Sequence, residues 1–88
     1  MSYEVGVHED AQERIMRKDL PVRERLLKRI ARMRDEPAGR HLKKGLPYFV
    51  IEAGQYRIAY TCDEKMRMKI VYFAGDHKEY ERWLGKRM

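Results

Sequence analysis

Two strand-like segments meet at a turn in the stretch Tyr48-Phe-Val-Ile-Glu-Ala-Gly-Gln-Tyr-Arg-Ile-Ala-Tyr60. A third follows in Met66-Arg-Met-Lys-Ile-Val-Tyr-Phe-Ala-Gly-Asp-His-Lys-Glu-Tyr80. Alternating side chains on either side of Gly54-Gln55 indicate a tight hairpin. The stretch therefore predicts three neighbouring antiparallel strands, at about residues 47–53, 56–61 and 67–74.

The segment before this stretch has helical spacing. Val22, Leu26, Ile30 and Met33 recur every three or four residues, and Pro21 suits the first turn of a helix that ends before Pro37. We also expect a short strand at residues 3–7, a helix from a capping box at residues 10–13 to about residue 18, and a last helix at residues 77–84. The order predicts a single α+β domain over residues 1–88, β-α-α-β-β-β with a short C-terminal helix.

Strand alternation also predicts the two faces of this small antiparallel sheet. The face that covers the two N-terminal helices is predicted to carry Phe49, Ile51, Tyr56, Ile58, Tyr60, Met68, Ile70 and Tyr72. The opposite face is predicted to carry Tyr48, Val50, Glu52, Arg57, Ala59, Lys69, Val71 and Phe73. We expect this second face to be open and positively charged, with Arg57, His77 and Tyr80 converging on it.

The composition narrows the class of partner. The 88 residues hold 20 Lys and Arg against 14 Asp and Glu, a formal charge of +6, which favours a polyanion such as nucleic acid, an acidic membrane or an acidic protein. Cys62 is the only cysteine, so no disulfide framework or zinc motif is expected. The sequence has no apolar run of membrane length and no signal peptide. It predicts a cytoplasmic protein with no metal, no cofactor and no membrane partner.

Metal-independent RNA cleavage needs a base for the 2′-hydroxyl, a cation for the phosphate and an acid for the departing oxygen. Arg57 is the leading candidate, since its planar guanidinium suits bidentate phosphate binding. The alternative for Arg57 is a structural salt bridge to Glu52 on the same face of the hairpin.

Two candidates follow the third strand. His77 can exchange a proton near neutral pH, although histidines at such positions often only cap a helix or lie on the surface. Tyr80 lies one helical turn later and can stack on a base or pass a proton, or it can be core packing. For Trp83, packing is the favoured interpretation.

Lysines supply the remaining candidates. Lys43 and Lys44 precede the hairpin, and a lysine crowded by other cations can act as a base or hold a phosphate, though most such pairs are ordinary surface residues. Glu52 is the competing base. Arg40, Lys69 and Lys78 are predicted to contact RNA.

The order of these motifs resembles the RelE/ParE toxin superfamily. The matching segments are Leu42-Lys43-Lys44, Gly54-Gln-Tyr-Arg-Ile-Ala-Tyr60 and Gly75-Asp-His-Lys-Glu-Tyr80, and the likeness covers nearly the whole chain. The resemblance implies a small sheet backed by two N-terminal helices. It places the family's strand arginine at Arg57, its later basic residue at His77 or Lys78, and its terminal tyrosine at Tyr80.

The resemblance also implies function. A RelE-like member would be the toxin of a toxin–antitoxin system, a ribosome-dependent endoribonuclease that cleaves mRNA in the decoding site and is masked by a cognate antitoxin. Its partners would be the antitoxin, the ribosome and mRNA. The alternatives are a ParE-like inhibitor of DNA gyrase and a non-catalytic RNA-binding protein. Glu52 departs from the basic residue that many relatives have nearby.

Overall fold

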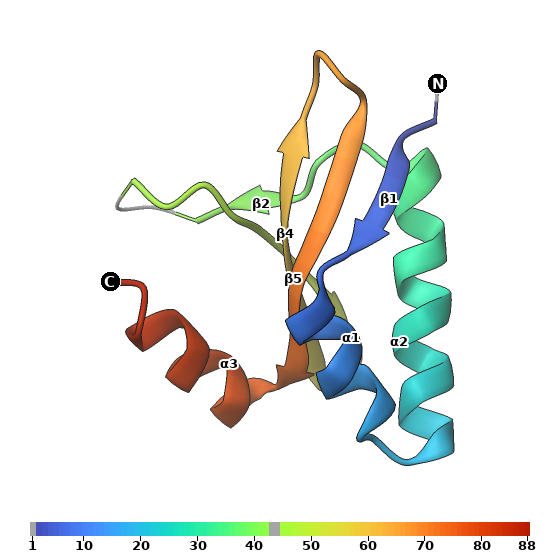
Figure 1. Cartoon of the computed structure of the whole chain (residues 1–88), viewed down its shortest axis with the longest axis vertical. Helices are drawn as coiled ribbons and strands as arrows, with labels where there is room; N and C mark the ends of the chain where they lie inside the picture. Colours follow the sequence, from blue (N-terminus) through green and yellow to red (C-terminus); the bar gives the residue numbers. More distant parts are fainter. Residues whose placement is uncertain (1, 43–44) are drawn as a thin grey trace.

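The computed structural model describes residues 2–42 and 45–88. Its elements follow the order shown in Figure 1. They are β1 (Glu4–Val7), α1 (Glu9–Met16), α2 (Leu20–Arg32), the 3-10 turn η1 (Met33–Asp35), β2 (Arg40–His41), β3 (Phe49–Ala53), β4 (Tyr56–Asp63), β5 (Met68–Asp76) and α3 (His77–Gly85). The α+β fold class and every predicted element are confirmed.

The sheet differs from the prediction in two ways. Its strand order is β1-β5-β4-β3-β2, and β1 pairs with β5 in parallel while the other pairs are antiparallel. The expectation of a wholly antiparallel sheet is therefore wrong at β1. A parallel neighbour needs a long crossover, and α1, α2 and the later strands lie between β1 and β5 in the chain. The second difference is β2, a two-residue strand that the sequence did not predict.

Local signals set the ends of the helices. The N-cap of α1 is His8, whose Nδ1 accepts from the backbone N–H of Asp10 at 3.1 Å, and not the predicted Asp10. Pro21 lies in the first turn of α2, as predicted. The hairpin turn at Gly54 has a φ of +64°, a conformation that favours glycine.

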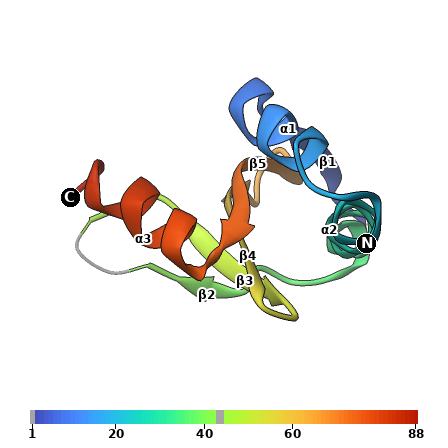
Figure 2. The same cartoon turned by 90° about the horizontal axis from the view of Figure 1, so that it is seen from below.

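The main core lies between the sheet and the two N-terminal helices. Ile58 and Tyr60 of β4 and Val71 of β5 contact Ile15 of α1 and Leu26 of α2 within one buried cluster. In Figure 2 these two helices lie on one side of β5 and α3 lies on the other. The predicted helix-facing positions of β3 and β4 are confirmed.

A second apolar cluster occupies the opposite face of the sheet, which the sequence predicted to be open. Tyr80 and Trp83 of α3 are 4% exposed and pack on Val50, Ala59 and Phe73. The face is therefore covered in part by α3, and that expectation is corrected. The predicted packing role of Trp83 is confirmed.

A register shift explains the misplaced side chains of β5. Ala59 pairs with Phe73, whereas Tyr60 pairs with Val71, so Tyr72 is the extra residue of a β-bulge. Before the bulge, Lys69 and Val71 face the N-terminal helices; beyond it, Phe73 faces α3. The faces predicted for Met68, Lys69, Ile70, Val71 and Tyr72 were consequently wrong.

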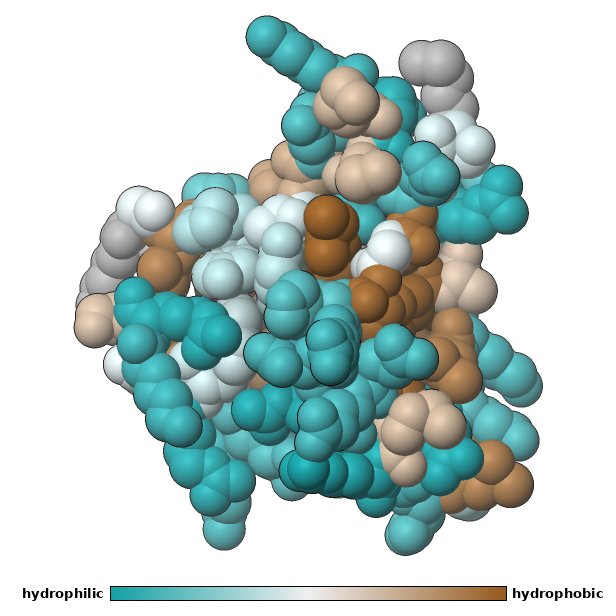
Figure 3. Space-filling model, in the orientation of Figure 1, coloured by the Kyte–Doolittle hydropathy of each residue, from teal (hydrophilic) through white to brown (hydrophobic). Residues whose placement is uncertain are grey.

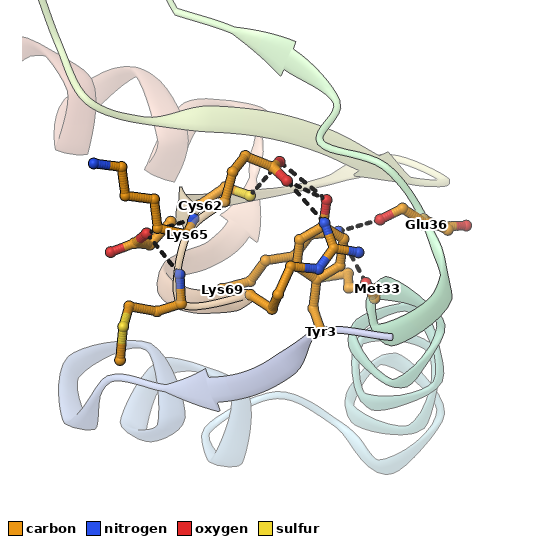
Figure 4. A network of polar contacts seen from close by, with 10 residues as sticks. Tyr3, Met33, Glu36, Cys62, Lys65 and Lys69 are labelled. Atoms are coloured by element: carbon orange, nitrogen blue, oxygen red, sulfur yellow. Dashed lines mark hydrogen bonds and ion pairs between the residues drawn. The ribbon is translucent and has the colours of Figure 1, made fainter. Parts of the chain in front are cut away.

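Lys69 is the charged residue that is buried in the core among the residues that the structure describes (Figure 4). It is 1% exposed, and its ammonium donates to the backbone oxygens of Met33 at 2.8 Å and Glu36 at 2.6 Å. It also lies 4.2 Å from the ring centroid of Tyr3. Burial lowers the pKa of Lys69. Because its ammonium binds these two carbonyls, Lys69 cannot contact RNA in this structure, contrary to the prediction.

The outer surface carries both hydrophobic and hydrophilic residues. In Figure 3 hydrophobic residues gather near the centre of the view, over β1, with hydrophilic residues around them. Met16, Leu20 and Leu27 of α1 and α2 are exposed apolar side chains. Among the helices that the structure describes, none is long and apolar enough to cross a membrane.

Candidate nucleic-acid site

Arg57 and Tyr80 come together across the covered face of the sheet. Arg57 belongs to β4 and is partly exposed, and its Cζ lies 5.1 Å from the ring centroid of Tyr80 on α3. The geometry is that of a cation over an aromatic face, which orients the guanidinium. The predicted proximity of these two residues is confirmed.

Arg40 adds a second guanidinium. It lies on β2 opposite Val50, on the same side of the sheet as α3, and it is exposed. Burial raises the pKa of Tyr80, while the charges of Arg57 and Arg40 oppose that rise. The Tyr80 hydroxyl therefore stays protonated at neutral pH. We refer to Arg40, Arg57 and Tyr80 as the arginine–tyrosine cluster.

Glu52 does not neutralise Arg57. The two residues are cross-strand partners in the β3–β4 hairpin. Nevertheless, no ion pair between Arg57 and a carboxylate is present among residues 2–42 and 45–88. The structural salt bridge considered from the sequence is thus not formed, and the guanidinium can accept a phosphate.

His77 and Lys78 lie at the start of α3 and are exposed. The Nε2 of His77 is 2.6 Å from Oε1 of Glu81, one helical turn later. In the described part of the chain, His77 forms no ion pair or ring contact with Arg57 or Tyr80. The structure therefore unites two of the three residues that we expected to converge, with His77 in a separate ion pair.

Lys43 and Lys44 lie outside the described residues, so their predicted roles stay predictions. Within the described ranges, no three His, Cys, Asp or Glu side chains form a group that could hold a metal ion. Cys62 is a free thiol that donates to Glu64 at 3.2 Å, and burial raises its pKa.

Glu79 fixes the helix that carries Tyr80. Asp76 accepts from the backbone N–H of Glu79 at 2.8 Å, and Glu79 accepts from that of Asp76 at 2.9 Å, which forms a capping box. The same carboxylate lies 2.5 Å from Nζ of Lys18. Burial acts to raise the pKa of Glu79, but these hydrogen bonds outweigh it and the pKa is lowered.

Gly75 makes this arrangement possible. A Cβ there would lie 2.8 Å from Phe73 and 2.9 Å from Oε1 of Glu79, both closer than such contacts allow. The close approach lets α3 turn back onto the sheet directly after β5. Sequence reasoning missed this covering of the sheet, although the Gly75-Asp76 pair and Glu79 carry its signal.

The fold matches solved structures of RelE toxins. The toxin–antitoxin complex RelBE2 from Mycobacterium tuberculosis superposes with a TM-score of 0.80 at 16% identity, over 88% of this chain and 100% of that chain. A mutant of the Escherichia coli toxin RelE in the free state gives 0.76 at 22% identity, over 100% and 99%. An archaeal RelE–RelB complex from Pyrococcus horikoshii gives 0.71 at 18% identity, over 86% and 96%.

The sequence itself matches no family model, and no curated protein matches it. At these identities the structural likeness shows that the chain has the RelE fold. The match extends over most of this chain and nearly all of each RelE chain, and it confirms the fold that the sequence motifs implied.

Proposed function

We propose that this chain, which has the fold of the RelE toxins, is the toxin of a toxin–antitoxin pair and cleaves mRNA on the ribosome. The observation that carries the proposal is the arginine–tyrosine cluster. It combines a strand-borne guanidinium without a carboxylate partner among the described residues with a protonated phenol whose ring centroid is 5.1 Å away. Those are the charge stabiliser and the acid that phosphodiester cleavage needs.

In the proposed reaction the ribose 2′-oxygen attacks the adjacent phosphorus and the 5′-oxygen departs. Arg57, with Arg40 beside it, stabilises charge on the phosphate oxygens, and Tyr80 protonates the departing oxygen. Glu52 and His77 are the described candidates for the base, together with Lys43 and Lys44. With so few groups, the ribosome is needed to align the 2′-oxygen, a contribution of roughly 7 kcal/mol or more.

The proposal includes an antitoxin partner. Two of the similar structures are toxin–antitoxin complexes. This chain offers a net charge of +6 and exposed apolar side chains at Met16, Leu20 and Leu27. A partner with acidic and apolar residues would cover both features. Coexpression with the product of the adjacent gene should relieve toxicity; unchanged toxicity with every neighbouring product would count against the antitoxin.

The test is cleavage of ribosome-bound mRNA by the purified protein and by Arg57→Ala. Removing a charge-stabilising group of this kind costs roughly 2.7–4 kcal/mol of transition-state stabilisation, so cleavage should fall about a hundredfold to a thousandfold. Folding should be retained because Arg57 is partly exposed and makes no ion pair in the described part of the chain. A folded Arg57→Ala that cleaves at the parental rate would remove Arg57 from the mechanism.

A second candidate is an inhibitor of DNA gyrase. The separate pairing of His77 with Glu81 favours it, because it leaves the arginine–tyrosine cluster without an adjacent histidine. Intact mRNA on the ribosome together with inhibited DNA supercoiling would support this candidate and overturn the nuclease.

A further inference from the structure

A cleft between α1 and α3 lies next to the arginine–tyrosine cluster and is not used by the proposed reaction. Its volume is about 460 Å3. Its walls hold the side chains of Asp10, Glu13, Arg14, Arg17, Glu79, Arg82, Trp83, Lys86 and Arg87. Five of these residues are cationic and three are acidic.

The acidic side chains of the cleft already have basic neighbours in it or beside it. Glu79 pairs with Lys18 and Arg14, and Glu13 pairs with Arg17. Asp10 is 3.9 Å from His8.

Three cations of the cleft remain without a carboxylate partner among the described residues, namely Arg82, Lys86 and Arg87. The cleft is therefore a place for an anion with several charges.

Aromatic rings form the second feature of this region. Arg14 lies 5.1 Å from the ring centroid of Phe73, and Arg87 lies 4.1 Å from that of Trp83. The walls of the cleft thus stand directly over aromatic side chains. Trp83 belongs both to the cleft and to a longer series of ring contacts.

That series, the aromatic strip, consists of Trp83, Tyr48, Tyr72 and His8. Successive ring centroids are 4.9 Å, 5.8 Å and 5.0 Å apart. Trp83 is buried, Tyr48 and Tyr72 are partly exposed, and His8 is exposed. The strip crosses from α3 to the start of α1 over β5, where the bulge turns Tyr72 toward this face.

The strip is continuous with the proposed site. Trp83 also contacts Tyr80 at a centroid distance of 6.2 Å, and Tyr80 is the ring beneath Arg57. An RNA strand bound along the strip would therefore lead toward the guanidinium of Arg57.

We propose that the cleft and the aromatic strip together bind single-stranded RNA, with the phosphates at Arg82, Lys86 and Arg87 and the bases on Tyr48 and Tyr72. Cations that follow a backbone beside exposed rings are the features with which proteins hold single strands, since every base has a stacking face. A duplex hides those faces and offers only its phosphates. The biological role of this binding rests on the proposed function, but the binding itself can be measured without cleavage.

The test is fluorescence anisotropy with labelled oligouridylate, labelled oligoadenylate and a labelled RNA hairpin, without ribosomes. Tyr72→Leu keeps apolar volume and removes the stacking ring. It should weaken single-strand binding by about fivefold or more and leave hairpin binding unchanged. Tyr56→Leu, on the opposite face, is the matched control, with folding of both followed by circular dichroism.

Arg82→Ala/Lys86→Ala tests the cleft through two exposed side chains whose replacement should not disturb folding. It should weaken binding of every RNA and reduce the salt dependence of single-strand binding by about 0.7 in log–log slope for each phosphate that is no longer neutralised. Arg25→Ala/Lys28→Ala on α2 removes the same charge elsewhere and is its control.

Three results would overturn the inference. They are a parent protein that binds no single strand, a folded Tyr72→Leu with parental affinity, and a Tyr72→Leu that loses hairpin and single strand equally. The first result would show that the surface does not bind single-stranded RNA on its own. Because no step requires turnover, these results are separable from a failure of the cleavage assay.

Discussion

Tyr80 contributes both to the apolar cluster under α3 and to the arginine–tyrosine cluster. Its ring packs on Phe73 at a centroid distance of 5.8 Å and lies beneath Arg57. Burial raises the pKa of its hydroxyl. The ring and the hydroxyl can therefore be separated experimentally, because phenylalanine keeps the first and removes the second.

We expect Tyr80→Phe to fold normally and to bind RNA as the parent does. If the hydroxyl protonates the departing oxygen, ribosome-bound cleavage should slow by about a hundredfold or more. Single-turnover cleavage with saturating protein measures the chemical step directly. Tyr56→Phe, which removes a hydroxyl from the opposite face of the sheet, is the control and should cleave as the parent does. Equal rates for Tyr80→Phe and the parent would assign the acid to another group.

Lys69 illustrates a charge used for structure. Its two bonds to the oxygens of Met33 and Glu36 join the end of α2 and η1 to the sheet. Lys69→Ala would leave a cavity and two carbonyls without their donor.

We expect Lys69→Ala to lower the free energy of unfolding by roughly 2–4 kcal/mol. Urea denaturation checks it, with Lys65→Ala at the exposed β4–β5 turn as the control. If Lys69→Ala lowered the free energy of unfolding no more than the control does, the two hydrogen bonds of the buried ammonium would make no net contribution to stability.

At the scale of elements, Glu79 joins α3 to the connection between α1 and α2. It accepts from the ammonium of Lys18 and from the backbone N–H of Asp76, and its pKa is lowered. A carboxyl whose pKa is lower in the folded state stabilises the fold above its unfolded pKa. That contribution is lost as the pH falls through the folded pKa.

Glu79→Gln should therefore cost roughly 1.5–3 kcal/mol at neutral pH, the range of a hydrogen bond to a charged group. The difference from the parent should shrink as the pH falls through the lowered pKa of Glu79, because the parental carboxyl is then protonated. Denaturation at a series of pH values measures it. Glu24→Gln, an exposed position on α2, should show no such convergence. A constant difference for Glu79→Gln at all pH values would exclude the charge as its cause.

At the scale of the whole molecule, the elements could be predicted because their signals are local. The helical spacing of Leu26 and Ile30 and the turn at Gly54 depend on neighbours in the chain. The meeting of Arg57 with Tyr80 was predicted from motif order, and the structure adds Arg40 through a strand of only two residues.

The faces of β5 and the covering by α3 could not be predicted in the same way. Val71-Tyr72-Phe73 is apolar throughout, so alternation alone does not show which residue is the extra one. Where α3 packs depends on the contacts of Tyr80 and Trp83 with Val50 and Ala59, which only the folded chain brings together. Lys69 was predicted on the wrong face because the bulge was not foreseen, and it was therefore expected on the open face.

The bulge at Tyr72 has a consequence for how β5 tolerates substitution during evolution. Before it, the odd-numbered positions 69 and 71 face the N-terminal helices; beyond it, the odd-numbered position 73 faces α3 and position 74 faces the main core. In related sequences, the positions of β5 that must stay apolar to face the main core should therefore be odd-numbered before the bulge and even-numbered after it. An insertion or deletion at this point would turn the following side chains to the wrong faces of the sheet. Selection should therefore conserve the length of β5 as strongly as its apolar residues.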